Sequence, residues 1–134
     1  MLNSALHQRE GRKADGLLGL LVAGELSGRA YCAARSAEAD AILSALWVDV
    51  FKDDTSGLSL LALGGYGRRE LCPYSDIDLL FLSSGKTDAA TDDAIEKFLY
   101  RLWDLGWKVG HAVRGVEECM ELAVRDSKVM TALL

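Results

Sequence analysis

Two aspartates separated by one residue, Asp76 and Asp78, have the types and spacing that could do chemistry in this sequence. They open an apolar run of strand length, and side chains two residues apart in a strand project to the same face. Neighbouring carboxylates repel unless a cation lies between them, and hard divalent ions such as Mg²⁺ take one or two carboxylates, phosphates and water as ligands. The pair therefore predicts a site for Mg²⁺, with Mn²⁺ as the second candidate.

A glycine-rich turn between two apolar runs supplies the other half of this predicted site. Gly64 and Gly65 have no side chains, so a triphosphate could approach their backbone N–H groups closely. Arg68 or Arg69, close behind the turn, could donate hydrogen bonds to phosphate oxygens, or both could form a solvated surface cluster with Glu70. The turn and the carboxylates together predict a nucleotide site that works with a metal ion.

Short strands and several helices must position these residues. The apolar patterns predict strands over residues 58–63, 76–83 and 107–113, and helices over residues 4–53, 88–105, 115–124 and 127–134. We expect a break in the first helical block near residues 27–28, Ser36 as the cap of its second helix, and Thr87 or Asp88 as a later cap. The loop of about ten residues between the first two strands is too short for a helical crossover, so these strands should be antiparallel or irregular neighbours. The predicted fold class is α/β or α+β, with a small mixed sheet flanked by helices.

Composition narrows the class of protein. The chain has 134 residues, 50% of them apolar and 26% charged, which fits one globular domain. Its net charge of −5 argues against a general nucleic-acid binder, which needs clustered Lys and Arg. The three widely spaced cysteines predict neither a zinc site nor a disulfide framework. Since no signal peptide or long apolar stretch is evident, we expect a cytoplasmic protein without a membrane span.

The glycine turn does not fit the dinucleotide-binding fingerprint, because Gly65-Tyr66-Gly67 lacks the third glycine and is soon followed by Pro73. A strand followed by Gly-Gly and then Asp-x-Asp resembles the nucleotidyltransferase signature of the DNA polymerase beta superfamily. Residues 64–80, GGYGRRELCPYSDIDLL, look like the amino-terminal domain of the bacterial PII-protein uridylyltransferase/uridylyl-removing enzymes. Residues 103–119, WDLGWKVGHAVRGVEEC, resemble the strand and helix that follow in that family.

The resemblance implies a nucleotidyltransferase fold in residues 55–134, cut short at its carboxy end, after an amino-terminal helical segment in residues 1–54. It implies that Asp76 and Asp78 hold the metal ions that activate an acceptor hydroxyl and stabilise an in-line displacement on UTP, from which pyrophosphate leaves. It also implies that Ser75, which precedes the acids, donates a hydrogen bond to a phosphate. The implied acceptor is a tyrosine of the PII nitrogen-signalling protein. Superfamily members usually employ a third carboxylate on a later strand, and the third expected strand contains none. Because that family continues into uridylyl-removing and sensing domains, we expect this chain to be a piece without those activities.

Several alternatives remain open at this stage. The same chemistry could use another nucleotide or acceptor, as in adenylylation, or the domain could bind a nucleotide without catalysis. We expect His111 to be a packed strand residue rather than a base, and Cys72 to be an inert thiol. Tyr66 and Tyr74 could stack on a base or serve packing, and Gly67 is expected to permit a positive φ in the turn.

Overall fold

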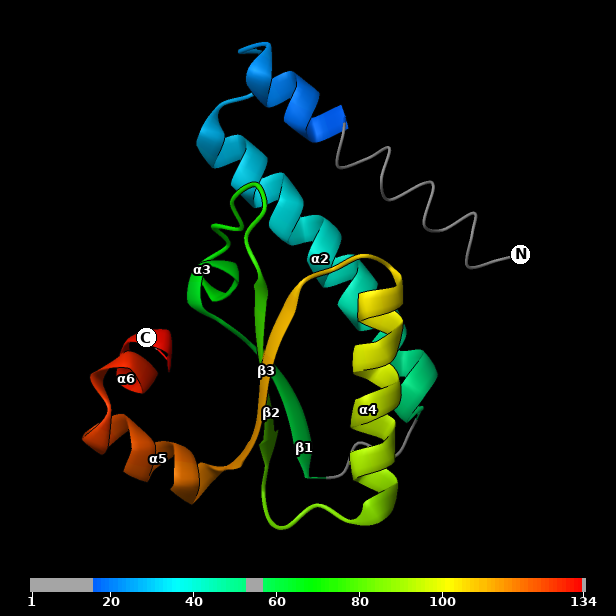
Figure 1. The fold of residues 1–134 in the computed structure, drawn as a ribbon, viewed down its shortest axis with the longest axis vertical. Helices are drawn as coiled ribbons and strands as arrows, with labels where there is room; N and C mark the ends of the chain where they lie inside the picture. Colours follow the sequence, from blue (N-terminus) through cyan, green and yellow to red (C-terminus); the bar gives the residue numbers. More distant parts are fainter. Residues whose placement is uncertain (1–15, 53–56, 134) are drawn as a thin grey trace.

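The computed structural model describes residues 16–52 and 57–133 (Figure 1). A short helix over residues 16–22 comes first. The elements that follow are α2 (Gly28–Phe51), β1 (Leu58–Leu63), α3 (Gly64–Gly67), β2 (Ile77–Ser83), α4 (Ala89–Asp104), β3 (Val109–Gly115), α5 (Val116–Arg125) and α6 (Ser127–Leu133). None of the helices in the described residues is long and apolar enough to cross a membrane.

The three strands form one mixed sheet in the order β1-β2-β3. β1 and β2 are antiparallel, with Leu63 opposite Asp78, whereas β2 and β3 are parallel, with Asp78 opposite Gly110. The parallel pairing requires a crossover, which α4 provides. The predicted α/β class and the antiparallel first pair are therefore confirmed.

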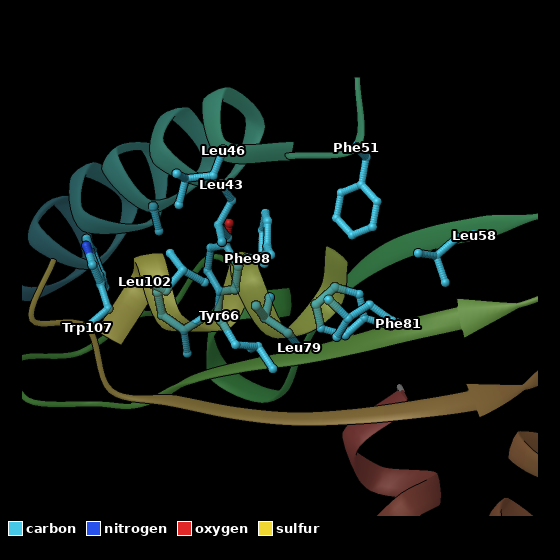
Figure 2. Close-up of a cluster of buried hydrophobic side chains, with 14 of the residues drawn as sticks. Leu43, Leu46, Phe51, Leu58, Tyr66, Leu79, Phe81, Phe98, Leu102 and Trp107 are labelled. Atoms are coloured by element: carbon cyan, nitrogen blue, oxygen red, sulfur yellow. The ribbon is translucent and has the colours of Figure 1, made fainter. Parts of the chain in front are cut away.

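One hydrophobic core joins the sheet to α2 and α4, which lie on the same side of it in Figure 1. Phe81 of β2 and Phe98 of α4 are fully buried and meet edge to face, with ring centroids 5.8 Å apart. Figure 2 shows these rings between the sheet and the helices, with Leu43 and Leu46 of α2 beside them. Aromatic pairs in this geometry add to the energy of apolar burial. The core holds β2 rigidly, and β2 carries Asp78.

The predicted break near residues 27–28 is confirmed, but Ser36 as the predicted cap of the helix that follows is wrong. The helix begins at Gly28, and its cap is Ser27, whose side-chain oxygen accepts a hydrogen bond from the Ala30 N–H at 3.2 Å. Ser36 is instead buried inside the helix, where its hydroxyl donates to the Cys32 carbonyl at 2.7 Å. A serine hydroxyl inside a helix can donate its hydrogen bond to the carbonyl oxygen one turn earlier. A serine in the sequence therefore does not by itself mark the end of a helix.

The third strand also starts later than predicted, at Val109 rather than at Trp107. Trp107 is buried, and the Arg35 guanidinium lies 4.0 Å from the centre of its ring. Its side chain therefore packs against α2 before the strand begins. The predicted cap Asp88 is confirmed, since its carboxylate accepts from the Thr91 N–H at 2.8 Å.

Candidate functional site

The predicted glycine turn is the single helical turn α3, which follows β1 directly. Gly64 has a φ of +58°, a left-handed conformation that favours glycine. A Cβ atom on Gly64 would lie 3.1 Å from Oδ2 of Asp78, and one on Gly65 would lie 3.2 Å from the Glu70 carbonyl oxygen. The bare backbone here allows the chain to turn tightly beside the Asp78 carboxylate.

The role expected for Gly67 is wrong, because the positive φ in this turn belongs to Gly64. Gly67 is needed for another reason: a Cβ atom there would lie 2.6 Å from the Ala62 carbonyl oxygen. Two backbone segments approach each other too closely for any side chain. Close packing, rather than backbone conformation, explains this glycine.

Asp78 lies in the middle strand and projects from the face opposite the main core. Its register partners are Leu63 on one side and Gly110 on the other. A Cβ atom on Gly110 would lie only 2.7 Å from Oδ1 of Asp78. The carboxylate thus lies between two glycines, Gly64 of α3 and Gly110 of β3.

Asp76 immediately precedes β2 and lies close enough to act on Asp78 electrostatically. The pKa of Asp78 is raised, first by desolvation and then by the negative charge of Asp76. Proximity to a cation would oppose both effects, so the pair has the electrostatics of a cation site. Within residues 16–52 and 57–133, no cluster of three or more His, Cys, Asp or Glu side chains is placed to hold a metal, so these residues supply no third carboxylate.

His111 is separated from this pair by the sheet. It is opposite Leu79 in the register, and Leu79 belongs to the main core, so the two residues share the face that α4 covers. Its ring lies 6.1 Å from that of Trp103. Its side chain is nevertheless exposed, so His111 is not the packed residue that we expected, although its place on this face also argues against a base at Asp78.

The other predicted site residues lie in the segment between α3 and β2. Arg69 binds Asp40 of α2, with Nη1 2.9 Å from Oδ2, and Arg68 Nε lies 3.5 Å from a Glu70 carboxylate oxygen. Both arginine side chains are at least half exposed, so neither ion pair is a strong constraint. Ser75 is exposed, and its N–H donates to the Cys72 carbonyl at 3.1 Å. Each arginine therefore has a carboxylate partner: Glu70 pairs with Arg68, as in the surface cluster that the sequence suggested, whereas the partner of Arg69 comes from α2.

Sequence reasoning missed the contribution of α2. The Tyr66 hydroxyl, on a side chain that is 5% exposed, donates to Oδ1 of Asp40 at 2.6 Å. The pKa of Tyr66 is raised by desolvation and then by this hydrogen bond. Tyr66 therefore anchors α3 to α2 and does not stack on a base. The sequence does contain a pattern that could have indicated this face of α2: side chains able to form hydrogen bonds recur at every fourth residue, at Cys32, Ser36 and Asp40.

These features define a small α/β domain of the nucleotidyltransferase-like class: a mixed sheet, a glycine turn after its first strand, and a paired carboxylate at the start of its second. No family model matches the chain.

The chain is a relative of enzymes named bifunctional uridylyltransferase/uridylyl-removing enzyme. It is 48% identical to the enzyme of Phenylobacterium zucineum over 71% of its length. It is also 48% identical to those of Pseudomonas putida, over 75% of its length, and Vibrio campbellii, over 70%. The chain spans 11% of the length of each of these relatives. The resemblance seen in the sequence is thereby confirmed.

Proposed function

We propose that this chain is a Mg²⁺-dependent nucleotidyltransferase domain that transfers UMP from UTP to a tyrosine of the PII signal protein in the cytoplasm. The observation that carries the proposal is the Asp78 carboxylate, set between Gly64 and Gly110 and next to Asp76. The names of the relatives support uridylyl transfer over other nucleotides.

Asp76 and Asp78 are the residues that would hold the metal. They fit a hard divalent cation because positive charge between them would offset both the desolvation and the repulsion from Asp76 that raise the pKa of Asp78. When bound, Mg²⁺ would supply charge neutralisation for the triphosphate and would lower the pKa of an acceptor hydroxyl. Mn²⁺, which also accepts carboxylate and water ligands, is the expected substitute.

The remaining residues would bind and orient the nucleotide. Gly64 and Gly65 leave room for a phosphate beside the backbone, and their lack of side chains keeps that space open next to Asp78. Arg68, Arg69 and Ser75 lie on the exposed segment that follows and would donate to the phosphates, the arginines by exchanging their present carboxylate partners. The tyrosine oxygen would bond to the α-phosphorus as the bond to pyrophosphate breaks.

The test is transfer of label from UTP carrying a labelled α-phosphate to purified PII protein, with Mg²⁺ present. We expect labelled PII and an equal amount of pyrophosphate, both lost in Asp76→Asn and Asp78→Asn, and little transfer from labelled ATP. If label were transferred from ATP and not from UTP, the nucleotide donor would be ATP and the proposed use of UTP would be wrong. Asp93→Asn, which removes an exposed acid of α4, is the matched control.

A second candidate function rests on the carboxylate count. The described residues supply two acids where the superfamily usually employs three, which favours a domain that binds a nucleotide without transferring it. Binding of UTP with Mg²⁺, but no pyrophosphate release with any nucleotide, would favour this candidate over the first.

A further inference from the structure

One face of α2 holds the segment that leads from the glycine turn to the aspartates. Asp40 binds Tyr66 and Arg69, and Ser36 accepts a hydrogen bond from the Leu71 N–H at 3.3 Å. One further turn back along α2, Cys32 meets Cys72. These contacts fasten residues 66–72 to the helix at successive turns.

The contact between Cys32 and Cys72 brings together two thiols from residues 40 positions apart in the chain. Their sulfur atoms lie 3.6 Å apart, and the Cys32 thiol donates to the Cys72 sulfur. A disulfide requires a separation of about 2 Å, so the sulfurs need to approach by roughly 1.5 Å. Rotation of two side chains and a small shift of one backbone segment would be enough.

Cys72 belongs to the segment that can make this shift. It lies between α3 and β2, outside any helix or strand, and its side chain is exposed. Two non-glycine residues near it, Arg69 and Tyr74, have positive φ, so the segment has no regular ladder of backbone hydrogen bonds around Cys72. Cys32, by contrast, is fixed within a helix of 24 residues.

We propose that Cys32 and Cys72 form a reversible dithiol–disulfide site, oxidised by low-molecular-weight disulfides, which locks the segment leading to Asp76 onto α2. The sequence predicted an inert Cys72, because no basic group was evident to activate its thiol. The partner comes from α2.

The reaction is thiol–disulfide exchange in two steps. The exposed Cys72 loses its proton to solvent, and its sulfur attacks one sulfur of the oxidant, which releases half of the oxidant as a thiolate and leaves a mixed disulfide. Cys32 then loses its proton, and its sulfur attacks the Cys72 sulfur and expels the second half. Two protein thiols give up two electrons and two protons, and one disulfide oxidant becomes two thiols.

The two cysteines suit these separate roles. Cys72 is the more exposed, so an oxidant in solution reaches it first. Desolvation, followed by the hydrogen bond to Cys72, raises the pKa of Cys32, so this thiol ionises less readily than an ordinary cysteine and is suited to the second step rather than the first. The third cysteine, Cys119, is buried in α5 and serves as an internal reference.

The experiment treats the whole chain with oxidised glutathione and counts thiols after denaturation, with peptide mapping by mass spectrometry. We expect the count to fall from three to one, a monomer lighter by two hydrogen atoms, and a cross-link between the peptides containing Cys32 and Cys72. Dithiothreitol should restore all three thiols. The oxidised chain should melt at least about 5 °C higher, because the bond closes a loop of about 40 residues.

Three variants make the test specific. Cys119→Ser should still lose two thiols, whereas Cys32→Ser should stop at a stable mixed disulfide of glutathione on Cys72, and Cys72→Ser should keep both remaining thiols. A wild-type chain that retains three thiols, accumulates glutathione on Cys72, or forms cross-linked dimers would overturn the proposal. Cys32→Ala provides a second variant if the serine disturbs the helix, and neither cysteine has been assigned to the nucleotide site.

Discussion

Oδ1 of Asp78 occupies the space that a side chain at Gly110 would need, since a Cβ atom there would lie 2.7 Å away. The atom in the way belongs to the end of a side chain and not to the backbone. A larger residue at 110 can therefore be accommodated by movement of the carboxylate. This relationship couples the position of β3 to that of the Asp78 carboxylate by steric contact alone.

Gly110→Ala should impair function and spare the fold. The added methyl group would displace the Asp78 carboxylate, and we expect the rate of UMP transfer to fall about tenfold or more, which corresponds to roughly 1.4 kcal/mol of transition-state stabilisation. The melting temperature should change by no more than a few degrees. Gly85→Ala, at a position with open space around it, is the control for both measurements. An unchanged rate would show that the position of Asp78 does not matter.

Gly67→Ala, unlike Gly110→Ala, should destabilise the fold itself. Its Cβ would lie 2.6 Å from the Ala62 carbonyl oxygen, a backbone atom that cannot rotate away. Overpacking of this kind costs about 1–3 kcal/mol of unfolding free energy, which urea denaturation would measure. A variant as stable as the wild type would indicate that the end of β1 can shift freely.

Asp78→Asn should remove the response of the protein to magnesium. In the absence of metal, the substitution relieves repulsion from Asp76, so the melting temperature should stay the same or rise. Adding Mg²⁺ at about 100 times its dissociation constant should stabilise the wild type by about 2.7 kcal/mol and the variant by much less. Removing the metal with a chelator should reverse the gain. Equal stabilisation of both proteins would place the cation elsewhere.

Asp40→Ala should loosen the glycine turn from α2. The buried Tyr66 hydroxyl would lose its acceptor, and an unsatisfied buried donor costs about 1–3 kcal/mol. Arg69→Ala, which breaks only the exposed ion pair with the same aspartate, should cost less than about 1 kcal/mol. Combining Asp40→Ala with Tyr66→Phe should cost less than the sum of the single changes. Strict additivity would argue against the contact.

The cap of α4 should make stability depend on pH. Hydrogen bonds from Thr91 hold the pKa of Asp88 below its usual 3.8, so its ionised form stabilises the folded chain above that pH. The contribution is lost as the pH falls through the lowered folded-state pKa. We expect Asp88→Ala to melt below the wild type at pH 7, with the gap closing under acid conditions. Asp88→Asn still caps but does not titrate, so its melting point relative to Asp88→Ala should not narrow in this way.

Local patterns were enough to predict the strands to within two residues at their ends. Leu58–Leu63 is a strand because an apolar run lies between glycines, whereas β2 begins at Ile77, one residue after the predicted start, so Asp76 precedes the strand. Ser36 misled because capping chemistry and back-bonding within a helix use the same hydroxyl. A capping serine and a serine that bonds back within the helix can be told apart only once it is known whether the preceding turn is helical.

The contacts between distant segments could not be predicted in this way. Asp40 meets Tyr66 across 26 residues, and Cys32 meets Cys72 across 40, and no local propensity encodes such pairs. The reason for Gly67 is likewise tertiary, since Ala62 approaches it only after β1 and α3 have formed. Composition and spacing supplied the residues of the proposed site, while the packing of α2 determines which of the neighbouring residues are anchored.

The crossover helix α4 joins β2 to β3 and thereby sets which residue of β3 stands beside Asp78. Strand faces repeat every two residues, so a slip of β3 by two positions would bring Lys108 or Ala112 to that place instead of a glycine. Lys108 would offer the carboxylate a competing ammonium group, and Ala112 would crowd it. Insertions or deletions within α4 are thus a route by which a helix that lies outside the acidic pair could change the affinity of that pair for the proposed cation.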